Sequence, residues 1–182
     1  MLEEQIEQIV KSPKIVIGPD PVLNKECEPV EWSFIYTSLA DSMIDTMRRN
    51  NGIGLAAPQI NLPVQFLVAE VENQVIYLGN PEIIETSEET WWMEEGCLSY
   101  PGVFVPVERP SEIIVKGLIA KDYYNQYTLN GMMARVIQHE MEHLKGISHI
   151  SYLSRPERRR VLSQLKKKKK NEHVQSNNNT RR

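Results

Sequence analysis

The chain has 182 residues, of which 41% are hydrophobic, and carries a formal net charge of −3 at pH 7. This length and composition are typical of one globular domain with a core of its own. The absence of any run of 18 apolar residues argues against a transmembrane helix, and the acidic start resembles neither a signal peptide nor an Arg-rich transit peptide.

Hydrophobic periodicity predicts helices at both ends of the chain and strands between them. In chain order, we expect a short helix, a longer helix, five strands, a further helix and a C-terminal helix, at 2–10, 32–49, 63–71, 75–78, 103–107, 112–119, 123–129, 130–145 and 154–170. A turn is expected at Glu72 and Asn73. Helices flanking consecutive strands indicate an α+β fold, with mainly antiparallel sheets packed around the helix at 130–145.

The segment Gly-Ile-Gly-Leu-Ala-Ala-Pro-Gln-Ile, at 52–60, is the first that suggests chemistry. Its two glycines allow another backbone to approach closely. The side-chain amide of Gln59 offers N–H groups that can stabilise an oxyanion. Taken alone, a Gly-x-Gly loop is equally typical of an ordinary turn.

Cys97 lies in a second segment, with Gly96 before it and Pro101 and Gly102 after it. These neighbours let the backbone turn sharply and present the thiol, although a small buried apolar role is the alternative. The other cysteine, Cys27, has acidic neighbours that raise its pKa, and we interpret it as inert. A disulfide between the two cysteines is the less favoured alternative.

His139, Glu140 and His143 form an H-E-x-x-H pattern in the helix predicted at 130–145. Positions i and i+4 lie on one face of a helix, so the two imidazoles can bind one metal ion, and the glutamate can act on a water bound to it. A pair of hydrogen-bonded core histidines is the alternative. With Cys97 as third ligand, one tetrahedral position stays open, as in catalytic sites. This nitrogen and sulfur donor set suits Zn(II), Fe(II), Co(II) or Ni(II).

Three segments occur together in the order GIGLAAPQ at 52–59, EGCLS at 95–99 and QHEMEH at 138–143. In this order they resemble the motifs of the peptide deformylase family, and the resemblance extends over about 14–165. It implies a metal-dependent hydrolase that removes the N-formyl group from the formyl-methionine of new peptides and releases formate. We therefore expect a catalytic domain over 1–165 and a basic, partly disordered tail over 166–182.

The resemblance also implies roles for single residues. Cys97, His139 and His143 would bind the metal ion, usually Fe(II), and Glu140 would be the general base and then the acid. The Gln59 side chain and the Leu98 backbone N–H would face the oxyanion, and Gly54 would contact the substrate backbone. The pocket for the substrate's methionine side chain would be shaped by Ile53, Glu95, Met132, Val136 and the stem of Arg135.

The chain departs from the family pattern at four positions. Glu142 and Ser151 stand where aspartate is usual, and His149 stands where phenylalanine is frequent. Many members have an arginine near Phe104 that contacts substrate carbonyls, so its absence leaves contacts beyond the first substrate residue unassigned. We interpret His149 as a surface or packing residue.

Charge is divided unevenly along the chain. Residues 1–154 contain 10 Lys and Arg against 22 Asp and Glu, a net −12, whereas 155–182 contain 11 against 2, a net +9. The basic end is either a solvated helix end or an electrostatic contact for RNA. Bacterial family members dock such a helix on the ribosome, so ribosomal RNA is the implied partner.

Two other functions compete with deformylation. One is a different H-E-x-x-H metallopeptidase, which the thiolate ligand Cys97 argues against because such peptidases generally use His or Glu as third ligand. The other is a non-catalytic protein that binds RNA or the ribosome, which the intact Glu140, Gln59 and Cys97 argue against. A thiolate ligand and few cysteines favour the reducing cytoplasm.

Overall fold

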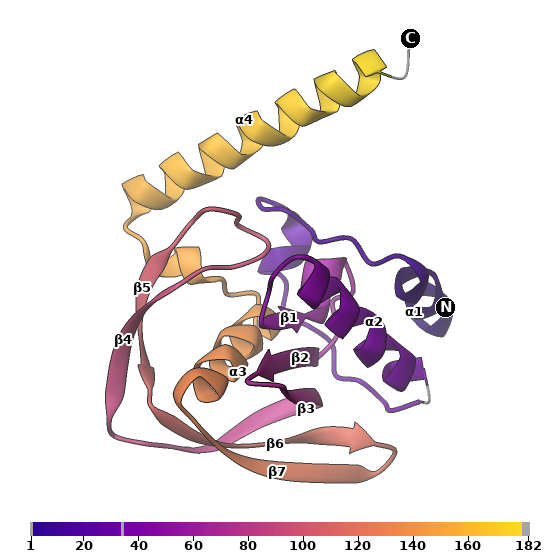
Figure 1. Ribbon diagram of the computed structural model, residues 1–182, viewed down its shortest axis with the longest axis vertical. Helices are drawn as coiled ribbons and strands as arrows, with labels where there is room; N and C mark the ends of the chain where they lie inside the picture. The colour runs from indigo at the N-terminus through magenta and orange to yellow at the C-terminus, as the bar shows by residue number, and fades with distance from the viewer. Residues whose placement is uncertain (1, 34, 180–182) are drawn as a thin grey trace.

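The middle of the chain forms two antiparallel sheets in the computed structural model, which describes residues 2–33 and 35–179 (Figure 1). The larger sheet has the strand order β1-β2-β3-β6-β7, formed by Gly54–Ala56, Phe66–Val71, Gln74–Thr86, Glu112–Ala120 and Tyr123–Asn130. The smaller sheet pairs β4, Thr90–Glu95, with β5, Val105–Pro110. The helices are α1, α2, α3 and α4, formed by Leu2–Lys11, Ile35–Arg49, Gly131–Leu144 and Arg155–Asn179. Three short 3-10 helices, η1, η2 and η3, span Pro21–Asn24, Ala57–Ile60 and His149–Tyr152. The predicted α+β class is confirmed.

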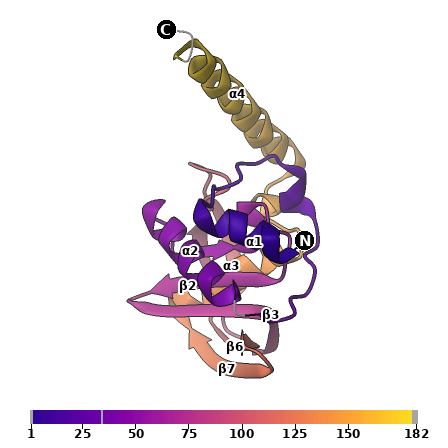
Figure 2. The ribbon, with the colours of Figure 1, turned by 90° about the vertical axis from the view of Figure 1, so that its right-hand side faces the viewer.

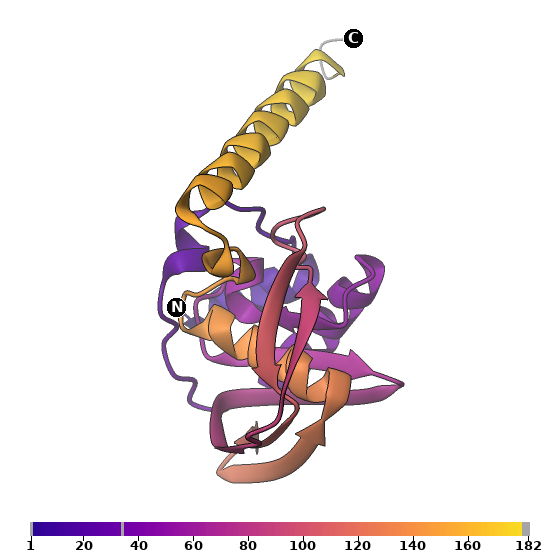
Figure 3. The ribbon, with the colours of Figure 1, turned by 90° about the vertical axis from the view of Figure 1, so that its left-hand side faces the viewer.

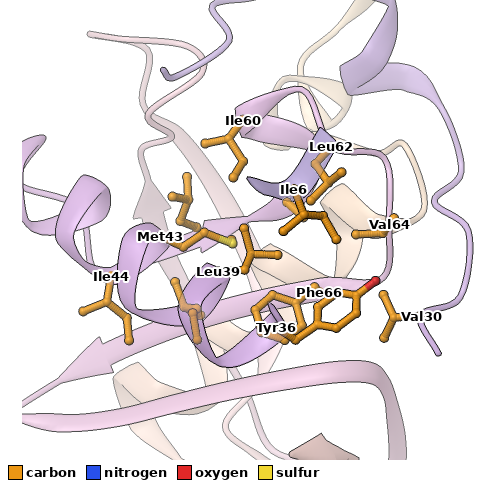
Figure 4. Close-up of a cluster of buried hydrophobic side chains, with 14 of the residues drawn as sticks. Ile6, Val30, Tyr36, Leu39, Met43, Ile44, Ile60, Leu62, Val64 and Phe66 are labelled. Atoms are coloured by element: carbon orange, nitrogen blue, oxygen red, sulfur yellow. The ribbon is translucent and has the colours of Figure 1, made fainter. Parts of the chain in front are cut away.

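Strand β2 has both faces buried, and this places helices on both sides of the sheet. Phe66 and Val68 pack into one apolar cluster with α2, whereas Leu67 and Ala69 pack into another with α3. The alternation follows from the two-residue period of a strand. The first cluster, which includes Leu39 and Met43 of α2, is drawn in Figure 4. Figure 2 shows α1 beside α2.

Helix α3 lies between the two sheets and contacts both β2 and β5 (Figure 3). It begins at Gly131, whose φ is 57°, and ends before Gly146, whose φ is 70°. A Cβ at Gly146 would lie 2.8 Å from the backbone carbon of Asn24, so this helix end requires glycine. The predicted helix is therefore confirmed, and its H-E-x-x-H face is buried between the sheets.

Several predicted boundaries were wrong. Strand β3 was expected to end at Leu78 but continues to Thr86, and a register shift between Gly79 and Glu82 accommodates Pro81. Helix α2 begins at Ile35 rather than at Trp32. The ring of Trp32 instead packs beside the rings of Phe66 and Tyr77. Strand β1 was not predicted, since its three residues lie in the glycine-containing loop. The turn at Glu72 and Asn73 is confirmed, with φ values of 52° and 65°.

Helix α4 projects away from the body of the protein in all three views (Figures 1, 2 and 3). Its first turns pack on the body through Val161, Leu162 and the buried Leu165. The helix continues to Asn179, beyond the expected end at Lys170, because residues 171–179 include no glycine or proline that would break it. The tail over 166–182, which was expected to be partly disordered, is helical up to Asn179, and 180–182 lie outside the described residues. Within the described part of the chain, the helices are all too short or too polar to cross a bilayer.

Candidate active site

Cys97, His139 and His143 converge at one point, although a loop between β4 and β5 supplies the cysteine and α3 supplies both histidines. One ligand atom of each lies within 4.8 Å of the others. Cys97 Sγ is 3.2 Å from His143 Nε2, and the centroids of the two imidazole rings are 5.1 Å apart.

Both cysteines are free, so the alternative of a disulfide is wrong. Cys27 is buried elsewhere, and burial, with its acidic neighbours, raises its pKa to about 12.

Glu95 orients one of the two imidazoles. Its Oε2 accepts a hydrogen bond from His139 Nδ1 at 2.9 Å, which leaves Nε2 as the nitrogen available to a metal ion. The same carboxylate accepts bonds from Arg109 Nε at 2.6 Å and from Arg135 Nη1 at 2.7 Å. Burial raises the pKa of Glu95, but the bonds from Arg109 and His139 outweigh it and hold the pKa well below its usual range. Glu95 is therefore ionised and fixes the ring of His139.

Replacing Glu95 by glutamine should destabilise the fold by about 3–5 kcal/mol, because two buried guanidinium groups lose their shared carboxylate. The pKa of Glu95 is lower in the folded chain than in the unfolded one. Its contribution is thus present above the unfolded pKa of about 4.3 and is lost as the pH falls through the folded pKa. Urea unfolding of E95Q at several pH values measures this, with the exposed Glu112 changed to glutamine as control. Equal stability of E95Q and E112Q at pH 7 would refute the assignment.

Glu140 follows His139 on α3 and is 4% exposed, and burial raises its pKa to about 7. Its Oε2 has no hydrogen-bond partner within the described residues. Gly54 of β1 makes room for this carboxylate: a Cβ there would collide with Glu140 Oε1 and lie 2.6 Å from Val136 Cγ1. A glycine is therefore required where β1 passes α3, a contact that the sequence pattern alone did not reveal.

Gln59 is held in a defined orientation beside the cysteine. Its Oε1 accepts a hydrogen bond from the backbone N–H of Ala56 at 2.7 Å. The amide nitrogen is thereby directed to Cys97 Sγ at 3.4 Å and to Ser99 Oγ at 3.3 Å. The side-chain donor of Gln59 consequently faces the same space as the cluster.

A cavity of about 620 Å³ opens onto the cluster. Every residue that the sequence analysis assigned to the site, except the fully buried His143, lines it: Ile53, Gly54, Gln59, Glu95, Cys97, Leu98, Met132, Arg135, Val136, His139 and Glu140. A larger cavity of about 1080 Å³, beside Lys14, Ile60 and Lys168, contains none of them. Because Cys97, His139 and Glu140 line the smaller cavity, we take it as the site.

The residues around His139 and His143 include polar groups to which the sequence analysis assigned no role. Arg109 Nη2 also donates to Glu142 Oε2 at 2.9 Å, and Tyr152 OH donates to Glu142 Oε1. Arg109 thus links Glu142, the residue before His143, to Glu95, which holds the ring of His139. His149, interpreted as surface or packing, is fully buried, and burial lowers its pKa to about 4. The sequence signal for Arg109 is its position in β5, because it follows Val105 and Val107 at the two-residue spacing of the buried face.

The donor set suits a divalent metal ion. A thiolate and two imidazoles form a mixed sulfur and nitrogen site, and the cavity leaves one side of it accessible. His143 Nδ1 has no hydrogen-bond partner within the described residues, and burial lowers the pKa of this ring well below its usual value. A neutral His143 can offer its Nε2 lone pair to a cation. The unpartnered Nδ1 of His143 favours the metal-binding interpretation over two fully hydrogen-bonded core histidines.

Comparisons with known proteins agree with this arrangement. The family model described as polypeptide deformylase matches residues 12–159. A peptide deformylase from Hydrogenovibrio crunogenus is 41% identical over 157 residues, which cover 84% of this chain and 92% of the relative. The crystal structure of the Thermotoga maritima peptide deformylase has a TM-score of 0.75 at 40% identity, over 78% of this chain and 97% of that one. The Ehrlichia chaffeensis peptide deformylase in complex with actinonin has a TM-score of 0.82 at 34% identity, over 86% and 96%.

Proposed function

The chain belongs to the polypeptide deformylase family, and from this premise we propose that Cys97, His139 and His143 bind the catalytic metal ion while Glu140 transfers protons. The reaction of the family is hydrolysis of the N-formyl group of new peptides, which releases formate. The observation that carries the assignment is the convergence of the three donor atoms within 4.8 Å, beside a buried carboxylate and an open cavity.

We propose Fe(II) as the native ion on the family resemblance, whereas the donor set alone suits Zn(II), Ni(II) or Co(II) equally. When bound, such an ion supplies Lewis acidity, which lowers the pKa of water from about 15.7 toward 7 and polarises the formyl carbonyl group. The thiolate of Cys97 stays reduced in the cytoplasm, where we place the protein.

Glu140 is suited to act first as base and then as acid. Its carboxylate would accept a proton from the attacking water and later return one to the departing amine. Burial raises its pKa to about 7, so both protonation states are accessible near neutral pH. Gly54 leaves the space that this carboxylate occupies and would let the substrate backbone pass close to it.

The negative charge that develops on the formyl oxygen would be stabilised by two donors. One is the Gln59 side-chain amide, which the Ala56 N–H holds in orientation. The other is the backbone N–H of Leu98, the residue after the metal-binding cysteine. Such a donor typically contributes about 3–4 kcal/mol to the transition state.

The substrate's methionine side chain would enter the apolar part of the cavity. Ile53 and Met132 are partly exposed at this cavity, and Val136 and the stem of Arg135 line it. Flexible aliphatic walls suit an unbranched thioether side chain. The guanidinium of Arg135 takes no part there, since it donates to Glu95 and to the backbone oxygens of Val107 and Trp91.

A product analysis distinguishes the proposed function from a peptidase. Formyl-Met-Ala should yield formate and intact Met-Ala, and unformylated Met-Ala-Ser should stay uncut. Cleavage of internal bonds in unformylated peptides would favour the alternative metallopeptidase. Absence of formate from protein loaded anaerobically with Fe(II) would refute the proposed function.

We further propose that residues 1–165 are the catalytic domain and that the basic end of α4 binds ribosomal RNA. Lys166, Lys167 and Lys168 are exposed, and they follow Leu165, which is buried in an apolar cluster with residues of the body. Truncation after Leu165 should weaken cosedimentation with ribosomes and leave hydrolysis of formyl-Met-Ala unchanged. Binding by the full chain should fall steeply as salt is raised, because basic side chains displace counterions from phosphates. Ribosome binding that ignores both truncation and salt would contradict this proposal.

A further inference from the structure

His149 is fully buried beside the metal-binding cluster, yet it is not one of the three candidate ligands. It lies on η3, with its ring 5.6 Å from the ring of Tyr100 and 5.8 Å from that of His139. Its Nε2 is 3.1 Å from the backbone oxygen of Val103. Since a carbonyl oxygen only accepts, Nε2 carries the proton and donates it to Val103.

The carbonyl group that His149 contacts belongs to a wall of the cavity. Val103 and Phe104 both line this cavity, and they follow Gly102, whose φ is 77°. The Phe104 ring lies over Gly96, where a Cβ would be 3.0 Å from Phe104 Cε1. Because the Phe104 side chain is 64% exposed, packing alone holds it weakly, and its place depends on the backbone of this segment.

Two hydrogen bonds hold the backbone of Val103, one at its N–H and one at its carbonyl oxygen. The Val103 N–H donates to the Tyr100 oxygen at 3.1 Å, within the same turn. The bond from His149 is the hydrogen bond that ties the segment to a different element, η3, and the Val103 side chain also packs on the apolar cluster that includes Ile150 and Leu165. Removing that hydrogen bond would leave the segment 102–104 held by its own turn and by the packing of the Val103 side chain, and would free the Val103 carbonyl group.

We propose that His149 is a positioning residue that holds the segment 102–104 as a wall of the substrate cavity through its hydrogen bond to Val103. The inference rests on the proposed function and adds a residue to it. The segment forms a wall of the cavity and is not among the groups that would transfer protons. His149 therefore acts on substrate binding and not on bond cleavage.

The test compares two substitutions of His149. H149F keeps an aromatic ring for Tyr100 to pack against but removes the donor. It should raise KM for formyl-Met-Ala by about fivefold and change kcat by less than about twofold. H149Q should restore the wild-type KM, because its amide nitrogen reaches a similar position and can donate to Val103.

A double variant tests whether His149 acts through this segment. F104A should raise KM by itself, and adding H149F should raise it no further, since both changes remove the same wall. An unchanged KM in H149F, a loss of bound metal, or a fall in kcat alone would overturn the proposal. If H149F does not fold, H149N takes its place: asparagine is too short to reach Val103, so the same rise in KM is expected. Wild-type formate release in each assay separates failure of this inference from failure of the proposed function.

Discussion

Replacing Glu140 by alanine should leave the bound metal in place and lower kcat for formate release by about 10²–10⁴-fold. The three donor side chains do not include Glu140, so the cation should remain. The loss arises because Glu95, the described carboxylate that contacts His139, is already engaged by Arg109, Arg135 and His139 and so does not replace Glu140. Metal analysis and steady-state kinetics on formyl-Met-Ala measure the two quantities separately.

Two further variants sharpen the Glu140 experiment. E140Q keeps the shape of the side chain but cannot take up a proton, so it should be as inactive as E140A. Glu88 is exposed, and E88Q should behave as the wild type. Turnover in E140Q within about tenfold of the wild type would show that another group is the base.

Replacing Cys97 by alanine should remove the bound metal and the hydrolysis together. The thiolate is one of the three donors, and loss of even a supporting contact typically costs about 10–100-fold in metal affinity, so loss of a ligand should cost more. The chain offers a matched control, because its other cysteine, Cys27, is buried away from the cluster. C27A should keep a full complement of metal and its activity.

The paired cysteine variants give a clear contrast. Metal content by elemental analysis, after anaerobic loading and removal of free ion, should be near zero for C97A and near wild type for C27A. Equal metal content in both variants would mean that Cys97 is not a ligand, and the H-E-x-x-H helix would then need another partner.

Much of the site was predictable because it depends on local signals. The spacing of His139 and His143, and Gly146 after the last turn, predict a helix with both rings on one face. The position of Cys97 next to them followed from the family motifs and is found in the structure.

Contacts between distant segments were not predictable in this way. Arg109 lies opposite Trp91 in the register of β4 and β5, yet its guanidinium reaches Glu95 and Glu142. His149 reaches Val103 across 46 residues of sequence, so its role depends on how η3 packs against the loop. The second strand was expected to end at Leu78, but a shift in register lets β3 continue past Pro81. In each case, tertiary packing decided what local propensity could not.

X-ray absorption spectroscopy at the metal edge of anaerobically purified protein tests the central claim most directly. The account predicts one metal ion per chain, coordinated by one sulfur and two imidazole nitrogens, with lighter scatterers from solvent in addition. A spectrum without a sulfur ligand, or with fewer than two imidazoles, would contradict it.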